Sequence, residues 1–237
     1  MAARRAERQR GCARRARSAK PAAMIDGVEW QVSPGLVPYD VALRDMEQRV
    51  ADIQAGEAHE RVWLLEHPPL FTAGTSADPV ELMNPQGFPV HEAGRGGRYT
   101  YHGPGQRVGY LNLDLARRGK DIRHFVHSLE GWMIASLARL GIEARREEGR
   151  IGLWVGQGEY EAKIGAIGVR VKRWVTLHGF SINVAPDLAH FGGIVPCGIS
   201  DYGVTSLEKL GLGADMADLD TALEAEFPAF LSALGKD

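Results

Sequence analysis

The sequence has very few cysteines and no long apolar segment, and both absences narrow the class of protein. Its 237 residues include only Cys12 and Cys197, one in a basic segment and one between a proline and a glycine. Cysteines in such different surroundings do not predict a disulfide framework, and a reducing compartment, the cytoplasm, fits them. Apolar runs such as 61–66 end at charged residues, far short of the roughly 20 residues that cross a bilayer. We therefore expect neither a membrane-spanning segment nor a membrane partner.

The chain also has little net charge, but its charges are unevenly distributed. Residues 1–23 carry a net charge of +7 within an overall charge of −2. Such a run can be a nucleic-acid-binding arm, a targeting peptide or a disordered tail, and no apolar stretch typical of an export signal follows it. We expect a disordered or mis-assigned extension ahead of Met24 and no nucleic-acid partner, with an organellar transit peptide as the alternative. Residues 24–237 are expected to form a single domain.

The spacing of apolar residues predicts the order of helices and strands. Strands are predicted at 28–32, 61–66 and 106–113, helices at 39–53 and 125–140, and loops from 67 to 97. Short segments separated by glycines predict an antiparallel meander with strands at 152–155, 162–171 and 174–184, followed by short helices at 206–210 and 219–234. Strands grouped in the middle of the chain indicate an α+β single domain, with a mixed, largely antiparallel sheet flanked by helices.

The segment 94–106 is unusually rich in glycine, with five glycines and one proline among its thirteen residues. Glycine loses much conformational entropy on folding, so we expect a ligand to approach this backbone closely. Arg95 and Arg98 could neutralise an anion there, although no Gly-Lys-Ser/Thr follows as a Walker motif would require. The alternative is a tight surface turn with a solvated His102.

Cys197 lies in a short apolar segment between Pro196 and Gly198, where a sharp turn could present its thiol. Free cysteines are often inert core residues, so a catalytic role requires a base or a positive charge that favours the thiolate. The sequence offers Lys163, His178, His190 and His102 as such groups.

Lys163 is the most informative of these candidates, because it lies within the apolar run 162–169. Burying an ammonium group is costly unless the group has a partner, and buried lysines can act as acids or bases. The alternative is a strand lysine whose side chain extends to water. His178 has a comparable alternative as a core histidine with its hydrogen bonds satisfied.

Four groups of residues resemble the lipoyl(octanoyl) transferase family in their order and spacing. They are 66–72, 95–106, 163–171 with 178–184, and 196–199 with 205–207. The resemblance extends over residues 28–210 and implies the fold that this family shares with biotin and lipoate protein ligases. Residues 24–237 would then be an acyltransferase catalytic domain.

The resemblance also implies roles for particular residues. Cys197 corresponds to the family's acyl-thioester nucleophile, and Lys163 to the lysine that serves as acid/base and favours the thiolate. The substrate-binding residues would be Arg95, Gly96, Gly97, Arg98, Tyr99, Thr100, Tyr101, His102, Ala166, Ile167, Gly168, Gly179, Phe180 and Ser181. The apolar residues Ile164, Ile167, Val169 and Phe180 are plausible walls for an acyl chain.

The family's reaction sets the expected partners. It transfers octanoyl from acyl carrier protein, which bears the phosphopantetheine, to lipoyl domains of 2-oxoacid dehydrogenase E2 subunits and to the glycine cleavage H protein. No metal and no cofactor of the enzyme are expected, because a thioester is already activated. An acidic carrier protein could dock on Arg107, Arg170, Lys172 and Arg173, although alternating cations also suit a solvated strand.

Two other functions are compatible with parts of this pattern. An ATP-dependent lipoate or biotin protein ligase would activate a free acid and would not need the thiol of Cys197. A non-catalytic protein that binds lipoyl domains or acyl carrier protein would have Cys197 merely packed.

Overall fold

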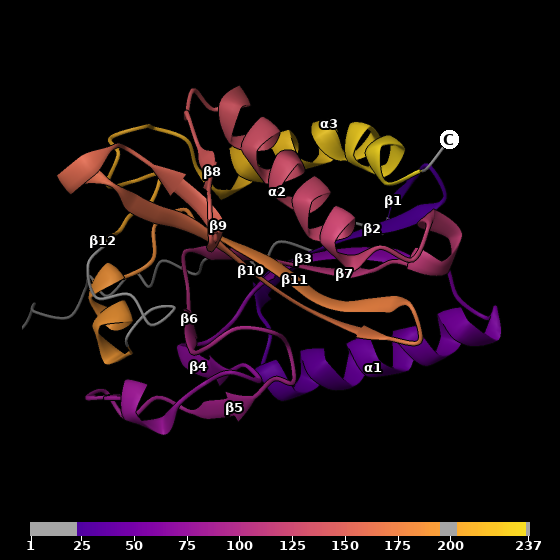
Figure 1. Ribbon diagram of the computed structural model, residues 1–237, viewed down its shortest axis with the longest axis horizontal. Helices are drawn as coiled ribbons and strands as arrows, with labels where there is room; N and C mark the ends of the chain where they lie inside the picture. Colours follow the sequence, from indigo (N-terminus) through magenta and orange to yellow (C-terminus); the bar gives the residue numbers. More distant parts are fainter. Residues whose placement is uncertain (1–22, 195–202, 236–237) are drawn as a thin grey trace, which may run out of the picture.

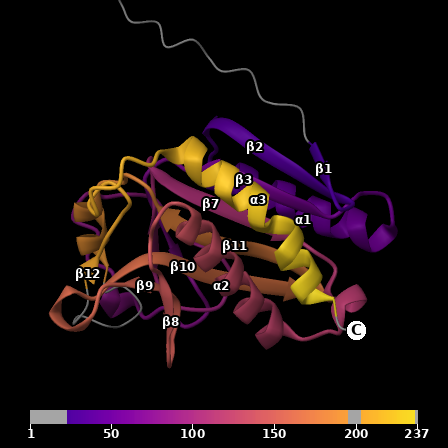
Figure 2. The same cartoon turned by 90° about the horizontal axis from the view of Figure 1, so that it is seen from above.

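The protein is a mixed sheet with helices on both faces. The computed structural model describes residues 23–194 and 203–235. Helix α1 (Tyr39–Ala55) covers one face of the sheet, and α2 (Ile122–Arg139) and α3 (Met216–Leu234) cover the other (Figure 1). The second view shows α2 and α3 side by side above the strands (Figure 2). The predicted α+β class is confirmed.

The main sheet has nine strands, and most neighbours are antiparallel. Its order is β1 (Ala23–Ile25), β2 (Val28–Leu36), β3 (Arg61–Glu66), β7 (Gln106–Asn112), β11 (Val175–Asn183), β10 (Ala162–Lys172), β9 (Arg150–Val155) and β8 (Arg145–Glu147), with β12 (Gly203–Val204) beside β10. Within the described residues of this main sheet, only the β2–β3 and β10–β12 pairs are parallel. The sheet is thus mixed and largely antiparallel, and β9, β10 and β11 form the predicted meander.

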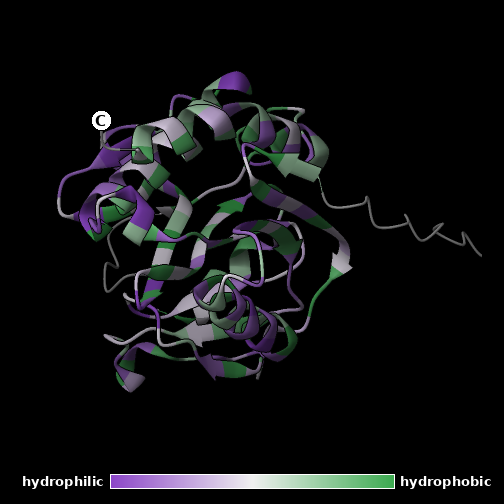
Figure 3. Cartoon of the chain, turned by 90° about the vertical axis from the view of Figure 1, so that its right-hand side faces the viewer, coloured by the Kyte–Doolittle hydropathy of each residue, from purple (hydrophilic) through white to green (hydrophobic). Residues whose placement is uncertain are grey.

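Side chains alternate between the two faces of the sheet along each strand, so there is one hydrophobic core on each face. Leu64 and Leu111 face α2 and α3, whereas Leu65 and Leu177 face α1. On α1 the buried residues recur at helical spacing, for example at Ala42, Met46 and Val50. Colouring by hydropathy shows the helices alternating between hydrophilic and hydrophobic stretches, as amphipathic helices do (Figure 3).

Side-chain caps explain where two helices begin. The carboxylate of Asp121 accepts a hydrogen bond from the backbone N–H of His124, so α2 begins three residues before the predicted helix. Asp215 and Asp218 form a capping box that starts α3 at Met216. No helix of the described residues is both long and apolar enough to cross a membrane.

Two parts of the chain differ from the prediction. The region predicted as loops, 67–97, contains the short strands β4 (Leu70–Ala73) and β5 (Val90–Glu92), which form a second sheet with β6 (Thr100–His102) from the glycine-rich segment. These strands have three or four residues each, too few to show a period in the sequence. The predicted helix at 206–210 is instead a series of turns, in which Leu210 N–H donates to Ser206 O at 3.1 Å. The remaining helical turns are 3₁₀ segments at η1 (Pro79–Glu81), η2 (Leu115–Arg118), η3 (Gly158–Tyr160) and η4 (Leu188–Gly193).

The aromatic cluster beneath α3 gives a test of the larger core. Phe227 is fully buried, with ring centroids 5.1 Å from Trp30 and 5.3 Å from Trp132. Phe227→Ala should lower the free energy of unfolding by about 3–5 kcal/mol, because it removes this ring and leaves a cavity. Urea denaturation measures the change, and Glu224→Ala on the exposed face of α3 is the control. Equal effects of the two substitutions would contradict this description of the core.

Candidate active site

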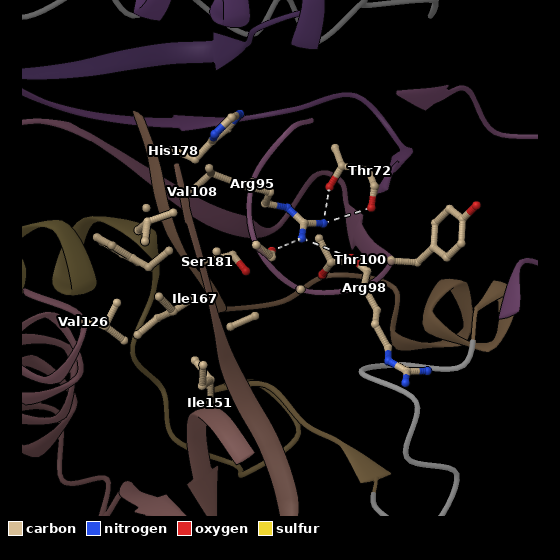
Figure 4. A pocket seen from close by; sticks show the side chains of 18 of the residues that line it. Thr72, Arg95, Arg98, Thr100, Val108, Val126, Ile151, Ile167, His178 and Ser181 are labelled. Atoms are coloured by element: carbon tan, nitrogen blue, oxygen red, sulfur yellow. Dashed lines mark hydrogen bonds between the residues drawn. The ribbon is translucent and has the colours of Figure 1, made fainter. Parts of the chain in front are cut away.

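A cavity of about 380 Å³ lies where the glycine-rich loop meets strands β10 and β11. This volume is within the range of small-molecule sites, roughly 300–1,000 Å³. Val126, Ile151 and Ile167 gather on one side of it, and Thr72 and Arg95 lie on the other (Figure 4). The cavity thus has an apolar wall and a polar wall.

Thirteen of the fourteen predicted substrate-binding residues line this cavity. They are Arg95, Gly96, Gly97, Arg98, Tyr99, Thr100, His102, Ala166, Ile167, Gly168, Gly179, Phe180 and Ser181. Tyr101 is the exception, because alternation along β6 turns its ring away from the cavity and into a cluster with Phe71 and Phe191. Its hydroxyl is hydrogen-bonded to Nδ1 of His190 at 2.8 Å, so that histidine also belongs to this cluster.

The expected acyl-chain walls are mostly where the sequence suggested. Ile167, Val169 and Phe180 line the cavity. Ile164 does not, because it lies at an irregularity in the β9–β10 pairing and is fully buried in the core beneath α2. The prediction for Ile164 was therefore wrong.

The loop 94–99 lies directly against β10. Gly96 N–H donates to Val169 O at 3.1 Å, and the Arg95 guanidinium donates to the carbonyl and hydroxyl oxygens of Thr72 at 2.9 and 2.7 Å (Figure 4). The same guanidinium also bonds the carbonyls of Gly96 and Arg98. A Cβ at Gly168 would come within 2.7 Å of Arg95 Cδ, so a larger residue there would displace the Arg95 side chain. The glycines therefore allow close packing of the protein against itself as well as an approach by a ligand.

Arg95 and Arg98 were expected to neutralise an anion. In this structure, both form hydrogen bonds or ion pairs with oxygen atoms of the protein. Arg95 holds the loop, and Arg98 extends in another direction and forms an ion pair with Glu81 (Figure 4). Of the suggested docking residues, Arg107 is 4% exposed and ion-paired with Asp220 at 2.8 Å, so it cannot belong to an exposed basic patch. Lys172 and Arg173 are exposed.

Lys163 lies on β10 at the edge of the cavity. Its Nζ donates to Ile151 O at 2.9 Å and lies 5.5 Å from the ring centroid of Trp154. The side chain is neither fully buried nor fully exposed, so it combines the two alternatives that the sequence left open. Its predicted partner, Cys197, lies outside the described residues.

The described ends of the segment that contains Cys197 both approach Lys163. Ile194 and Val204 line, together with Lys163, a smaller cavity next to the first. Val204 also pairs with Lys163 between β12 and β10, and Thr205 N–H donates to Lys163 O at 3.0 Å. The chain thus re-enters the described structure beside this lysine, and Ile194, before the segment, shares a cavity with it.

Two buried histidines, His102 and His178, belong to the polar wall, and His67 lies behind them with its ring centroid 5.7 Å from that of His102. His67 donates from Nδ1 to Val37 O at 2.6 Å, and its Nε2 is hydrogen-bonded to the Tyr110 hydroxyl at 2.7 Å. His178 Nε2 is hydrogen-bonded to the Tyr39 hydroxyl at 3.1 Å. His102 donates from Nδ1 to Gln106 Oε1 at 2.6 Å. Burial lowers the pKa of His67 to about 4 and that of His102 and His178 to about 3. Burial also raises the pKa of Tyr39 to about 12. At neutral pH these imidazoles are neutral and weak proton acceptors, which disfavours His102 and His178 as the base.

Several lining residues were not predicted from the sequence. Tyr39, Thr72 and Trp154 line the cavity from α1, β4 and β9. Trp154 had a detectable signal, because a six-residue connection between 155 and 162 places it opposite Lys163 in an antiparallel pair. Tyr39 and Thr72 approach the site only through the tertiary fold.

The cavity has an apolar wall, lies under a glycine-rich loop and has an amine at its edge. On a mixed sheet flanked by helices, this combination suits an enzyme that handles acyl groups. Residues 38–228 match the model of the lipoyl protein ligase A/B catalytic domain, and the chain belongs to this family.

Curated relatives and solved structures agree with this assignment. The chain is 67% identical to an octanoyltransferase of Sphingopyxis alaskensis, over 87% of this chain and 95% of the relative, and 58% identical to an octanoyltransferase of Zymomonas mobilis, over 89% and 97%. A lipoate-protein ligase A bound with ATP has a TM-score of 0.64 at 16% identity, over 84% of each chain. A bipartite lipoate protein ligase of Thermoplasma acidophilum, solved with its E2 lipoyl domain, has a TM-score of 0.62 at 16% identity, over 86% and 82%. The structures show the fold alone, and the relatives confirm that the chain is an acyltransferase.

The buried histidines predict a specific pH dependence of stability. Because their folded pKa values lie below the ordinary 6.5, the unfolded chain binds more protons, so stability falls as the pH decreases below about 6.5. Each histidine should contribute a slope of up to about 1.4 kcal/mol per pH unit. Urea denaturation between about pH 7 and pH 5, above the range where most carboxylates titrate, measures the slope.

Two variants identify the source of this slope. His102→Gln should reduce the slope by about one third, because one of the three histidines no longer takes up a proton on unfolding. His59→Gln, at an exposed position, should leave the slope unchanged. A slope that is the same in wild type and in His102→Gln would show that His102 does not titrate on unfolding.

Proposed function

We propose that this chain transfers an octanoyl group from acyl carrier protein to a lysine of a lipoyl domain, through a thioester on Cys197. The octanoyl group rests on the curated relatives, which are named octanoyltransferases. The acceptors are lipoyl domains of 2-oxoacid dehydrogenase E2 subunits and the glycine cleavage H protein, in keeping with the lipoyl domain in one solved relative of the same fold. We place the reaction in the cytoplasm.

One observation supports the mechanism most directly. The Lys163 amine lies at the edge of the apolar-walled cavity, and the described ends of the segment containing Cys197 flank it. Eight residues lie between Ile194 and Gly203, so the segment that bears the thiol is short. A cation fixed beside a cysteine favours the thiolate, which is the nucleophilic form.

The reaction proceeds in two acyl transfers. The Cys197 thiolate attacks the carbonyl carbon of the octanoyl thioester, a new C–S bond forms, and the phosphopantetheine thiolate leaves and takes a proton from Lys163. The ε-amine of the acceptor lysine then attacks the acyl-enzyme, the amide C–N bond forms, and Cys197 leaves as the thiolate while the amine's proton returns to Lys163. A thioester is already activated, so the reaction requires neither a nucleotide nor a metal.

The apolar wall accounts for the acyl chain. Ile151, Ile167, Val126 and Phe180 would cover it, and each buried methylene group contributes about 0.8 kcal/mol to binding. Backbone N–H groups of the glycine-rich loop or near Cys197 are the candidates for stabilising the oxyanion of each tetrahedral intermediate.

Mass spectrometry of the intact protein tests the covalent step. Incubation with octanoyl-acyl carrier protein should add one octanoyl group to the wild type and none to Cys197→Ser, because the serine hydroxyl is not ionised near neutral pH. The same adduct on both proteins, or transfer without any adduct, would contradict the thioester. Consumption of ATP with free octanoate would instead support a ligase, and unchanged transfer by Cys197→Ser would exclude a role for the thiol.

The role of Lys163 gives a second test. Lys163→Met keeps the length of the side chain but removes its charge and proton, so the rate of acyl-enzyme formation should fall by about 10²–10⁴-fold. Single-turnover kinetics with octanoyl-acyl carrier protein measures this rate. Lys209→Met, at an exposed lysine away from the cavity, is the matched control and should retain wild-type kinetics. Equal rates for the two variants would remove Lys163 from the mechanism.

A further inference from the structure

Strand β9 surrounds the Lys163 amine with two groups that suit an ammonium ion. The carbonyl of Ile151 accepts a hydrogen bond from Nζ at 2.9 Å, and the indole of Trp154 lies 5.5 Å from the same atom. A carbonyl oxygen and the face of an aromatic ring are both good partners for a cation. Both groups come from one short strand that pairs with β10, so the amine is held from the side of its neighbouring strand.

Gly152, between these two residues, leaves the space that the lysine occupies. A Cβ at this position would lie 2.5 Å from Lys163 Cε, 3.0 Å from Nζ and 2.7 Å from Gly165 O. Its φ of 122° is in the region that favours glycine. This backbone conformation occurs next to the Ile151 carbonyl that accepts the hydrogen bond from Lys163. Because Gly152 has no side chain, the lysine side chain can occupy the space beside it.

A buried carboxylate supports this part of β9 from the helix behind it. Glu130 of α2 is 8% exposed and accepts a hydrogen bond from Gly152 N–H at 3.4 Å. Its other oxygen lies 3.2 Å from Nε of Arg146. The indole N–H of Trp154 donates to Arg150 O at 3.1 Å, and the Arg150 guanidinium carbon lies 4.4 Å from the ring centroid, so both contacts with Arg150 help to fix the ring.

We infer that Gly152 and Trp154 are positioning residues for catalysis, which hold the Lys163 ammonium group at the edge of the cavity through space and through the indole face. This inference rests on the proposed function for its catalytic meaning, but its geometry is independent of any reaction. Of the two, Trp154 lines the cavity and Gly152 does not. Their substitution should lower the rate of the acyl-transfer step and leave the affinity for the acyl donor nearly unchanged.

Two substitutions of Trp154 separate the indole face from simple packing. Trp154→Phe keeps an aromatic face, whereas Trp154→Leu replaces it with an aliphatic group of similar burial. Trp154→Leu should lower kcat about two- to thirty-fold with little change in KM, and Trp154→Phe should recover most of the loss. Equal kcat values for the two variants would overturn the role of the aromatic face.

Alanine substitutions test the space at Gly152. Gly152→Ala should displace the lysine and lower kcat at least tenfold. The control is Gly158→Ala, which also has a positive φ, 61°, but has nothing within 4 Å of the new Cβ. A Gly152→Ala enzyme that matches Gly158→Ala in kcat would overturn the inference. If Gly152→Ala fails to fold, judged by its melting curve, the Trp154 pair decides alone.

A spectroscopic measurement keeps this inference separate from the proposed function. In protein with ¹³C-labelled lysine, the ε-methylene signal of Lys163, assigned by its loss in Lys163→Met, should be shifted upfield by the indole ring current. The shift should disappear in Trp154→Leu and persist in Gly158→Ala. Its absence from the wild type would overturn the inference whatever the activity, whereas its presence in a protein without octanoyl transfer would refute the proposed function and leave the geometry standing.

Discussion

The cavity depends on the close approach of the loop 94–99 to strand β10. Gly96 is hydrogen-bonded to β10, and Arg95 lies over Gly168, where any side chain would come within 2.7 Å of it. The Arg95 guanidinium donates hydrogen bonds both to carbonyls of the loop and to Thr72. These bonds hold the loop in place over the cavity. A single added carbon at position 168 would displace the Arg95 side chain that holds this loop. The glycine pattern therefore reflects packing within the protein first, and room for a ligand second.

The same arginine adds a second, smaller cause to the lowered pKa of His178 in the interior. Burial lowers the pKa of His178 most, and the nearby positive charge of Arg95 lowers it further. A second cation beside Arg95 would be costly in this desolvated place, so the imidazoles and the hydroxyls of Tyr39 and Tyr110 form a neutral network. The proposed proton transfers are therefore assigned to the cavity's edge, where Lys163 is partly open to solvent.

Much of the fold and part of the site could be predicted from the sequence. Lys163 stands out because an ammonium group inside an apolar run is unusual, and helix α1 shows a clear period. The orientation of Tyr101 could not be predicted, because its direction depends on a strand of only three residues whose existence the sequence does not reveal. The place of Trp154 follows from the hairpin register, but its relation to Lys163 also depends on the unusual φ of Gly152, which has no signature beyond the residue type.

The fold by itself does not decide between a transferase and a ligase, since a ligase that binds ATP shares it at 16% identity. A ligase must activate a carboxylate, whereas a transferase starts from a thioester and needs a nucleophile with a steady cation beside it. In the proposed mechanism that cation is Lys163 on β10, whose Nζ donates to the Ile151 carbonyl of β9. On our inference, the glycine and the tryptophan two positions apart on β9 serve this proposed cation: Gly152 leaves space for the lysine side chain, and the Trp154 ring lies 5.5 Å from its Nζ.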